Sequence, residues 1–139
     1  MKRFKFNLEK ILQLRKFKEE ECRIVLGQAI GVLNRIENEI METAVKRHNA
    51  SSMRFSNPLE ITAWDYYISR LDQETQNLTE QAAQAELVVE EKRALYLEAS
   101  KDLKAIEKLK EKQQKEYRKE MFNSEMAEVD DITAARYFL

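Results

Sequence analysis

The stretch ITAWDYYISRLDQETQNLTEQAAQAELVVEEKRALYLEASKDLKAI, residues 61 to 106, decides the fold. Stepping through it alternately by three and four residues gives a line of mostly apolar positions, which we call the second-helix seam: Ile61, Trp64, Ile68, Leu71, Thr75, Leu78, Ala82, Ala85, Val89, Lys92, Tyr96, Ala99, Leu103 and Ile106. This spacing is the 3.5-residue period of a left-handed coiled coil. The segment therefore predicts one long helix that packs along another.

An apolar stripe earlier in the chain predicts the other helix. Its members are Leu8, Ile11, Leu12, Cys22, Val25, Leu26, Ala29, Leu33, Ile36, Ile40 and Ala44. The stripe is less regular, because Arg15, Lys18 and Glu19 interrupt it. Gly27 and Gly31 lie near it, and each costs about 1 kcal/mol relative to alanine inside a helix. These glycines either soften and bend the helix or allow another backbone to approach closely.

A polar break between His48 and Pro58 separates the two helices. Asn57 is a good N-cap, Pro58 suits the first helical position, and Glu60 completes a capping box. We predict a first helix over about 5–50, a turn at 51–57 and a second helix over about 58–122. The C-terminal segment 123–139 is either a further short helix, capped by Asn123 or Ser124, or disordered until it binds a partner.

The composition agrees with an all-α protein in one domain. The 139 residues include only 2 Gly and 1 Pro, and 35% of them are charged, which is typical of coiled coils. We therefore predict a long two-helix antiparallel coiled coil with a longer second helix. No run approaches the roughly 18 apolar residues that cross a bilayer, so we expect no membrane insertion. The single Cys22 favours a reducing cytoplasm as the location.

Folding the chain back at about residue 55 predicts which residues face each other. Residue 33 should lie opposite about residue 79, and residue 11 opposite about residue 100. Lys92 should then lie near Glu19, Glu20 and Glu21, where an ion pair would fix the alignment. The second helix should have no partner helix from about Leu109 to Phe122, and an unpaired apolar face indicates a binding partner.

The charge pattern and the absence of catalytic motifs favour a protein-binding role. Residues 1–23 carry a net charge of +4 and residues 101–120 a net charge of +3, so antiparallel folding predicts a positive terminal end that suits an acidic partner. The glutamates interleaved among the lysines of 101–119 favour intrahelical ion pairs over nucleic-acid binding. His48 has no neighbouring ligand for a metal site, and no phosphate loop or catalytic triad is present. We expect neither an enzyme nor a cofactor.

Four segments resemble the FliJ family of flagellar type III export proteins. They are the opening FKFNLEKILQLR at 4–15, WDYYISRL at 64–71, LKAIEKLKEKQQKEY at 103–117 and EVDDITAAR at 128–136. The segments occur in the family's order and span nearly the whole chain. The one departure noted is Asp131, where the family ending commonly has Glu.

The resemblance implies a cytoplasmic component of the flagellar export apparatus that associates peripherally with its membrane-embedded part. Family members bind the hexameric export ATPase through a stalk-like terminal end, bind the cytoplasmic domain of the export gate, and escort export chaperones. The matching ATPase-contact positions are Phe6, Leu8, Ile11, Tyr117 and Phe122. The matching gate-contact positions are Tyr67, Leu71 and Leu78. The two leucines lie on the seam and suit core packing better, so Tyr67, which flanks the seam, is the better candidate. A stalk subunit of another ATPase and a coiled-coil chaperone remain the alternative functions.

Overall fold

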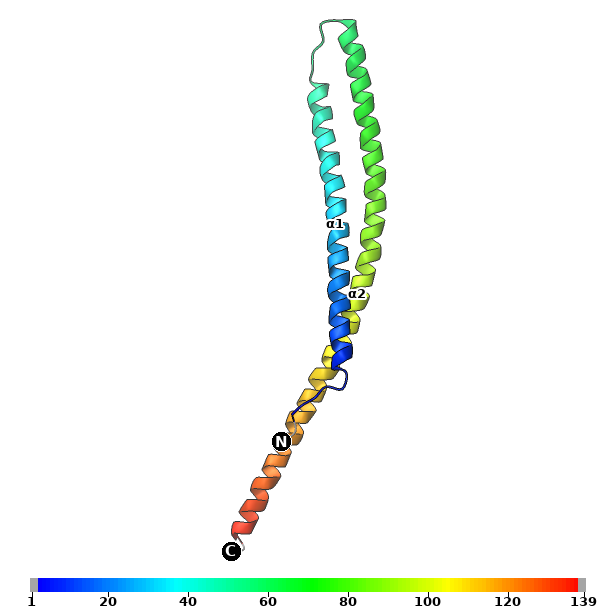
Figure 1. Ribbon diagram of the computed structural model, residues 1–139. Coiled ribbons are helices and arrows are strands. Elements are labelled where there is room, and N and C mark those ends of the chain that lie inside the picture. The colour runs from blue at the N-terminus through cyan, green and yellow to red at the C-terminus, as the bar shows by residue number, and fades with distance from the viewer. Residues whose placement is uncertain (1–2, 138–139) are drawn as a thin grey trace. The chain divides into compact units, whose positions relative to one another are not determined.

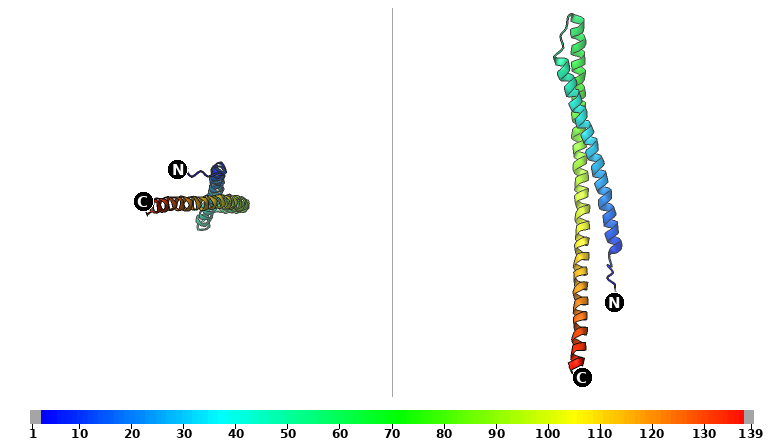
Figure 2. Two further views of the ribbon diagram at one scale, coloured as in Figure 1. Left: turned by 90° about the horizontal axis from the view of Figure 1, so that it is seen from below. Right: turned by 90° about the vertical axis from the view of Figure 1, so that its left-hand side faces the viewer.

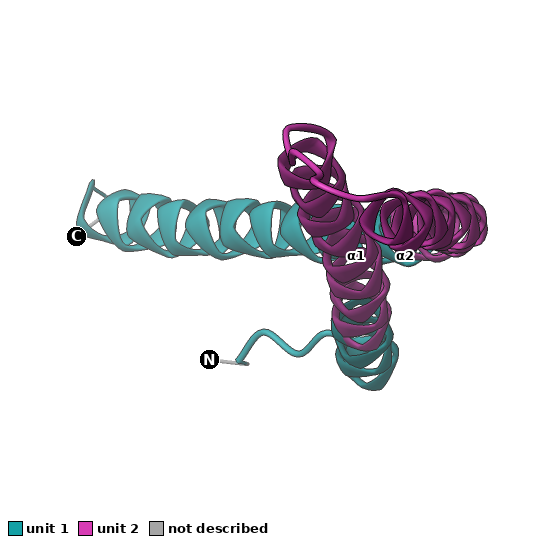
Figure 3. Cartoon of the chain, turned by 90° about the horizontal axis from the view of Figure 1, so that it is seen from above, with its two compact units in different colours: residues 1–20, 98–139 teal, residues 21–97 magenta. Residues whose placement is uncertain are grey.

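The structure, a computed structural model, describes residues 3–137 as two helices joined by one turn (Figure 1). Helix α1 (Glu9–Ser51) has 43 residues and α2 (Pro58–Tyr137) has 80. The helices pack antiparallel and the second is longer, which confirms the predicted fold class. The chain divides into two compact units, one of residues 21–97 and one of residues 1–20 with 98–139 (Figure 3). Each unit is described separately.

The start of α2 follows the predicted capping signal. The Asn57 side-chain oxygen accepts a hydrogen bond from the Glu60 backbone N–H at 2.9 Å. The Glu60 carboxylate in turn accepts hydrogen bonds from the backbone N–H and the hydroxyl of Ser56, at 3.0 and 3.2 Å. The box therefore closes one residue earlier than its usual form, on Ser56. These bonds satisfy donors that the first turn of a helix leaves free.

The end of α1 is fixed by hydrogen bonds to its last carbonyl groups. The hydroxyls of Ser51 and Ser52 donate to the carbonyls of His48 and Asn49, at 2.7 and 3.0 Å. The buried Ala50 carbonyl accepts the Trp64 indole N–H at 2.7 Å. Trp64 thus ties the beginning of α2 to the end of α1, so the first seam residue that contacts α1 also closes the hairpin.

Burial along α2 confirms the predicted seam. Every seam residue from Trp64 to Ile106 is buried or half-buried. Ile61 is the exception, with 47% of its surface exposed. In the unit of residues 21–97, the central cluster consists of Ile36 from α1 with Leu78 and Ala85 from α2. The period of 3.5 therefore identified the buried face of α2 correctly.

Burial along α1 corrects the predicted stripe. The non-exposed positions recur with the same regular steps of three and four residues as in α2, and they include Leu12, Arg15, Glu19, Ile36 and Thr43. Leu12 is only 2% exposed, whereas Ile11, which the stripe also included, is 40% exposed. Arg15 does not interrupt the stripe, because it is half-buried and its guanidinium donates to the Asp102 carbonyl at 2.9 Å. Long charged side chains can occupy such positions because their stems are apolar.

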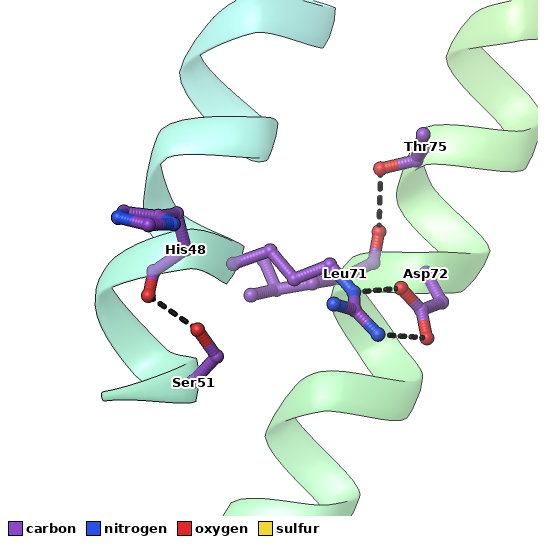
Figure 4. Close-up of polar contacts among 6 residues, drawn as sticks. His48, Ser51, Leu71, Asp72 and Thr75 are labelled. Atoms are coloured by element: carbon purple, nitrogen blue, oxygen red, sulfur yellow. Dashed lines mark hydrogen bonds and ion pairs between the residues drawn. The ribbon is translucent and has the colours of Figure 1, made fainter. Parts of the chain in front are cut away.

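The pairing of the helices differs from the prediction by about seven residues, which is one heptad. Leu12 packs with Ile106, whereas the simple fold-back placed residue 11 opposite about residue 100. In the other unit, Arg47 forms an ion pair with Asp72 at 2.6 Å, beside the buried Leu71 (Figure 4). The non-helical residues 52–57 explain the shift. An extended residue advances the chain by about 3.3 Å and a helical one by 1.5 Å, so α2 begins beyond the end of α1.

The predicted contact between Lys92 and Glu21 of α1 is not an ion pair in the unit of residues 21–97. Lys92 is half-buried at its seam position and lines a hollow of about 200 Å³ with Glu21, Cys22, Val25 and Leu95. Among the described residues of this unit, Lys92 forms no ion pair with Glu21 within 4.0 Å. Within this unit, the ammonium group therefore occupies a seam position without an ion pair to Glu21.

We expect Lys92→Leu to stabilise the hairpin by about 1 kcal/mol, because a leucine would fill the apolar side of this hollow. Thermal unfolding followed by circular dichroism measures the effect. The exposed Lys104→Leu is the matched control and should leave the melting temperature nearly unchanged. A lower melting temperature for Lys92→Leu would show that the lysine makes a stabilising contact after all.

The C-terminal part of α2 corrects the predicted end of the second helix. α2 runs without a break past residue 122 to Tyr137 (Figure 2). Asn123 and Ser124 therefore lie inside the helix and cap nothing, and the alternative of a separate short helix is wrong. Residues 138 and 139 of the predicted tail lie outside the described residues. The absence of Gly and Pro from this segment removes the usual signals that end a helix.

Candidate protein-binding surfaces

The N-terminal residues cover part of α2 within the unit of residues 1–20 and 98–139. Phe6 is 8% exposed and packs with Leu12 and Ile106. The rings of Phe4 and Tyr117 lie with their centroids 5.6 Å apart. We predicted that α2 would be unpaired from about Leu109, but this segment extends the covered region to Tyr117. The one-heptad shift in pairing and the non-helical residues before Glu9 together account for the difference.

The five predicted ATPase-contact residues thus fall into two groups. Phe6 is buried, and Leu8 and Tyr117 are half-buried, so these three help to hold the N-terminal segment on α2. Ile11 and Phe122 are 40% and 62% exposed, so both are available to a partner. Phe6 and Leu8 pack in one cluster with Leu12 and Ile106, and Tyr117 lies against Phe4. Phe122 lies beyond them, on uncovered helix.

The uncovered part of α2, residues 118–137, carries a line of exposed apolar side chains. Every residue in it is exposed except Met121, which is half-buried. Its apolar members recur at helical spacing and are Phe122, Met126, Val129 and Ile132, with 47 to 62% of their surfaces exposed. Such a stripe on one side of a polar helix is the pattern by which helices bind in the grooves of partner proteins.

One ion pair links the two ends of this unit. The Lys110 ammonium lies 3.0 Å from the Glu9 carboxylate and 6.0 Å from the centre of the Phe6 ring. The hydrogen bond from Lys110 lowers the pKa of Glu9 below its usual value, and a second hydrogen bond from the Gln13 amide lowers it further. Lys110 is thereby held over the aromatic segment that covers α2.

We expect this ion pair to make stability depend on pH in the acid range. Because the pKa of Glu9 is lowered in the folded chain, its contribution is fully present above the usual carboxyl pKa and is lost as the pH falls from there through the lowered pKa. Lys110→Met should therefore lower the melting temperature at pH 7 but have little effect at pH 3. Thermal unfolding at both values tests this, with the exposed Lys108→Met as control. An equal loss at both values would contradict it.

The second candidate surface is a hollow at the turn, in the unit of residues 21–97. It has a volume of about 480 Å³ and is lined by Met53, Arg54, Phe55, Glu60, Ala63, Trp64 and Tyr67. The rings of Phe55 and Trp64 meet edge-on at 5.6 Å and form its apolar wall. Sequence reasoning did not find this hollow. The sequence feature that indicates this hollow is the pair of aromatic residues Phe55 and Trp64 on either side of Pro58.

The predicted gate-contact residues are separated by burial. Leu71 and Leu78 are 2% and 7% exposed and belong to the interface between α1 and α2, in agreement with their seam positions. Tyr67 is half-buried, lines the hollow, and has the Arg70 guanidinium 5.9 Å from its ring centre. Of the three, Tyr67 is therefore the residue whose side chain a partner can reach.

Neither surface carries an arrangement for chemistry. Within residues 3–137 no group of three His, Cys, Asp or Glu side chains could hold a metal ion. His48 lies in the last turn of α1, as predicted. No described helix is both long and apolar enough to span a bilayer. What the two surfaces offer is exposed aromatic and aliphatic side chains on helices.

The fold and these surfaces define a two-helix coiled-coil protein with exposed apolar side chains on its helices. The family comparison is more specific, because residues 4–139 match the family described as Flagellar FliJ protein. The chain belongs to the FliJ family and is a component of the flagellar export apparatus, a role that is not enzymatic in this family. No match to the chain is found among curated proteins or among solved structures.

Proposed function

We propose that this chain couples the hexameric export ATPase to the export gate and escorts export chaperones. The ATPase would be bound through the unit that contains both ends of the chain, and the gate through the hollow at the turn. The single observation that carries the proposal is the uncovered apolar stripe of α2 around Phe122, in a chain of the FliJ family.

Charge and exposure support the ATPase contact. Residues 101–120 carry a net charge of +3, and the N-terminal segment that packs on them adds further lysine and arginine side chains. Ile11 and Phe122 add exposed apolar surface to this positive region. A partner with acidic residues around an apolar groove would be complementary to it. Phe6, Leu8 and Tyr117 would then support the contact by holding the N-terminal segment in place.

The gate contact is best supported at Tyr67. This side chain borders an open hollow whose walls are aromatic, and aromatic residues in partly enclosed sites dominate many protein interfaces. Leu71 and Leu78 would act on gate binding only indirectly, by keeping α1 and α2 together. Chaperone binding has no assigned surface and stays part of the proposal through the family alone.

ATP turnover of the purified export ATPase, with and without this protein, tests the proposal, together with a pull-down. We expect stimulation at about one chain per hexamer. Phe122→Ala should weaken both binding and stimulation, because Phe122 is exposed and its loss leaves the fold intact. Leu87→Ala, also at an exposed residue (71%), is the matched control and should have no effect.

Gate binding is measured separately, by titration of the gate's cytoplasmic domain. Tyr67→Ala should weaken it, whereas the neighbouring and more exposed Tyr66→Ala should not. Absence of both interactions in a well-folded chain would refute the coupling role. Suppression of the aggregation of unrelated unfolded proteins would instead favour the coiled-coil chaperone.

A further inference from the structure

A second line of heptad positions runs along α1 on the side opposite its seam. We call it the outer stripe, and it consists of Ile24, Gly27, Gly31, Asn34, Asn38, Met41 and Val45. All seven residues are exposed and none is charged, although 35% of the chain is charged. Ile24, Met41 and Val45 are 54%, 67% and 58% exposed. Uncharged residues at alternating steps of three and four are typical of a surface that packs against another helix. No part of this unit covers the outer stripe.

Both glycines of the chain lie in the outer stripe. A Cβ atom added to Gly27 or Gly31 would meet nothing within 4 Å, and neither residue has a positive φ. Neither packing against α2 nor the backbone conformation therefore requires glycine at these positions. Each glycine nevertheless weakens the helix relative to alanine. A reason for them is the close approach of another helix backbone at this point.

We propose that the outer stripe is the interface of an antiparallel homodimer, in which α1 packs against α1 of a second copy. Gly27 lies opposite Gly31 of the second copy, and the two-fold axis passes between the two helices at the level of residue 29. A two-fold axis presents the same surface on both copies, so the interface must be complementary to itself. The glycines allow close approach at the crossing, and Ile24 lies opposite Asn34 of the second copy on both sides of it.

The charges beside the stripe support the second copy as the occupant. Glu21 and Arg35 flank the stripe on one side, and Arg23 and Glu37 flank it on the other. In an antiparallel pair, flanking residues on the same side face each other across the interface. With the two glycines opposite each other, Glu21 meets Arg35 of the second copy and Arg23 meets Glu37 of the second copy. Symmetry doubles both contacts.

Two further observations favour this alignment. Among the described residues, Glu21, Arg35 and Glu37 form no ion pair within their own chain at 4.0 Å or less. A parallel pair would instead bring Glu37 beside Glu42 of the second copy, and like charges in such positions repel. The charge pattern therefore selects both the partner and its direction.

Charge reversal tests the proposal directly. Sedimentation equilibrium over a wide concentration range should show the mass rising from monomer to dimer. Glu21→Arg and Arg35→Glu, made singly, each place two like-charged pairs in the interface and should raise the dissociation constant roughly tenfold or more. The double variant Glu21→Arg with Arg35→Glu restores opposite charges and should dimerise nearly as well as the natural chain.

Glycine replacement separates dimerisation from folding. Gly31→Ala should raise the melting temperature of the dilute, monomeric protein, because alanine favours the helix. Gly31→Leu should abolish the dimer, because its side chain blocks the close approach. If Gly31→Leu abolishes the dimer while the monomer stays folded, Gly31 acts in dimerisation and not only in folding.

Two results would overturn the proposal. One is a monomer at every concentration. The other is a dimer that tolerates both the single charge reversals and Gly31→Leu. Such a dimer would use another surface. Phe122→Glu would then test whether that surface is the uncovered part of α2. The outer stripe lies in residues 21–97, so the charge reversals and the Gly31 replacements leave Phe122 and the other proposed ATPase-contact residues unchanged.

Discussion

Leu71→Ala is expected to destabilise the hairpin by about 3 kcal/mol, within the range measured for leucine truncations in protein cores. Leu71 is only 2% exposed and lies on the α2 seam beside the ion pair between Arg47 and Asp72. Truncation removes apolar contacts and leaves a cavity that two packed helices cannot easily close. Urea unfolding, followed by the helical signal in circular dichroism, measures the loss.

The same variant decides what Leu71 does in gate binding. If Leu71 acts by holding the hairpin together, Leu71→Ala should weaken binding only under conditions in which it also unfolds the chain. Tyr67→Ala should weaken binding with little change in stability, since Tyr67 borders the hollow at the turn. Leu87→Ala, at an exposed position, controls for the loss of a leucine as such. Loss of gate binding by a fully folded Leu71→Ala would show direct contact instead.

The heptad pattern predicted the buried face of α2 but not its alignment with α1. A seam repeats every seven residues, so shifting one helix by a heptad places seam against seam again. The choice between these alignments depends on the path of residues 52–57 and on the hydrogen bond from Trp64 to the Ala50 carbonyl. Both depend on the three-dimensional course of the turn, which residue spacing does not contain.

The misassigned stripe of α1 has a different cause. Reading hydrophobicity alone favoured Ile11 over Arg15, whereas the structure exposes Ile11 and half-buries Arg15. Position in the heptad, continued from Leu12, would have ranked them correctly. Heptad spacing applied to the opposite side of α1 identifies the outer stripe. This stripe is recognised by its lack of charged residues more than by its apolar residues.

The candidate sites were predicted only as far as exposure can be inferred from sequence. The unpaired end of the second helix predicts that Phe122 is exposed, and the structure confirms it. Phe6 was assigned to the same contact by resemblance, and it is buried against Leu12 and Ile106. The difference arises because residues before Glu9 fold back on α2 without being helical, and no periodic pattern marks such a segment.

Leu12→Ala is expected to cost about 3 kcal/mol of stability, while Ile11→Ala should cost less than about 1 kcal/mol. These adjacent residues make a matched pair, since Leu12 is 2% exposed and Ile11 is 40% exposed. Leu12 packs with Phe6 and Ile106, so its truncation should also release the N-terminal segment from α2. Urea unfolding measures the stability, and faster proteolysis of residues before Glu9 would report the release.

The pair also separates two routes to the ATPase. Ile11→Ala should reduce stimulation of ATP turnover in a chain of nearly natural stability, because it removes an exposed apolar contact. Leu12→Ala should reduce stimulation only as far as the N-terminal segment is released from α2. Equal stability losses at the two positions would show that both side chains are buried and would remove Ile11 from the proposed contact.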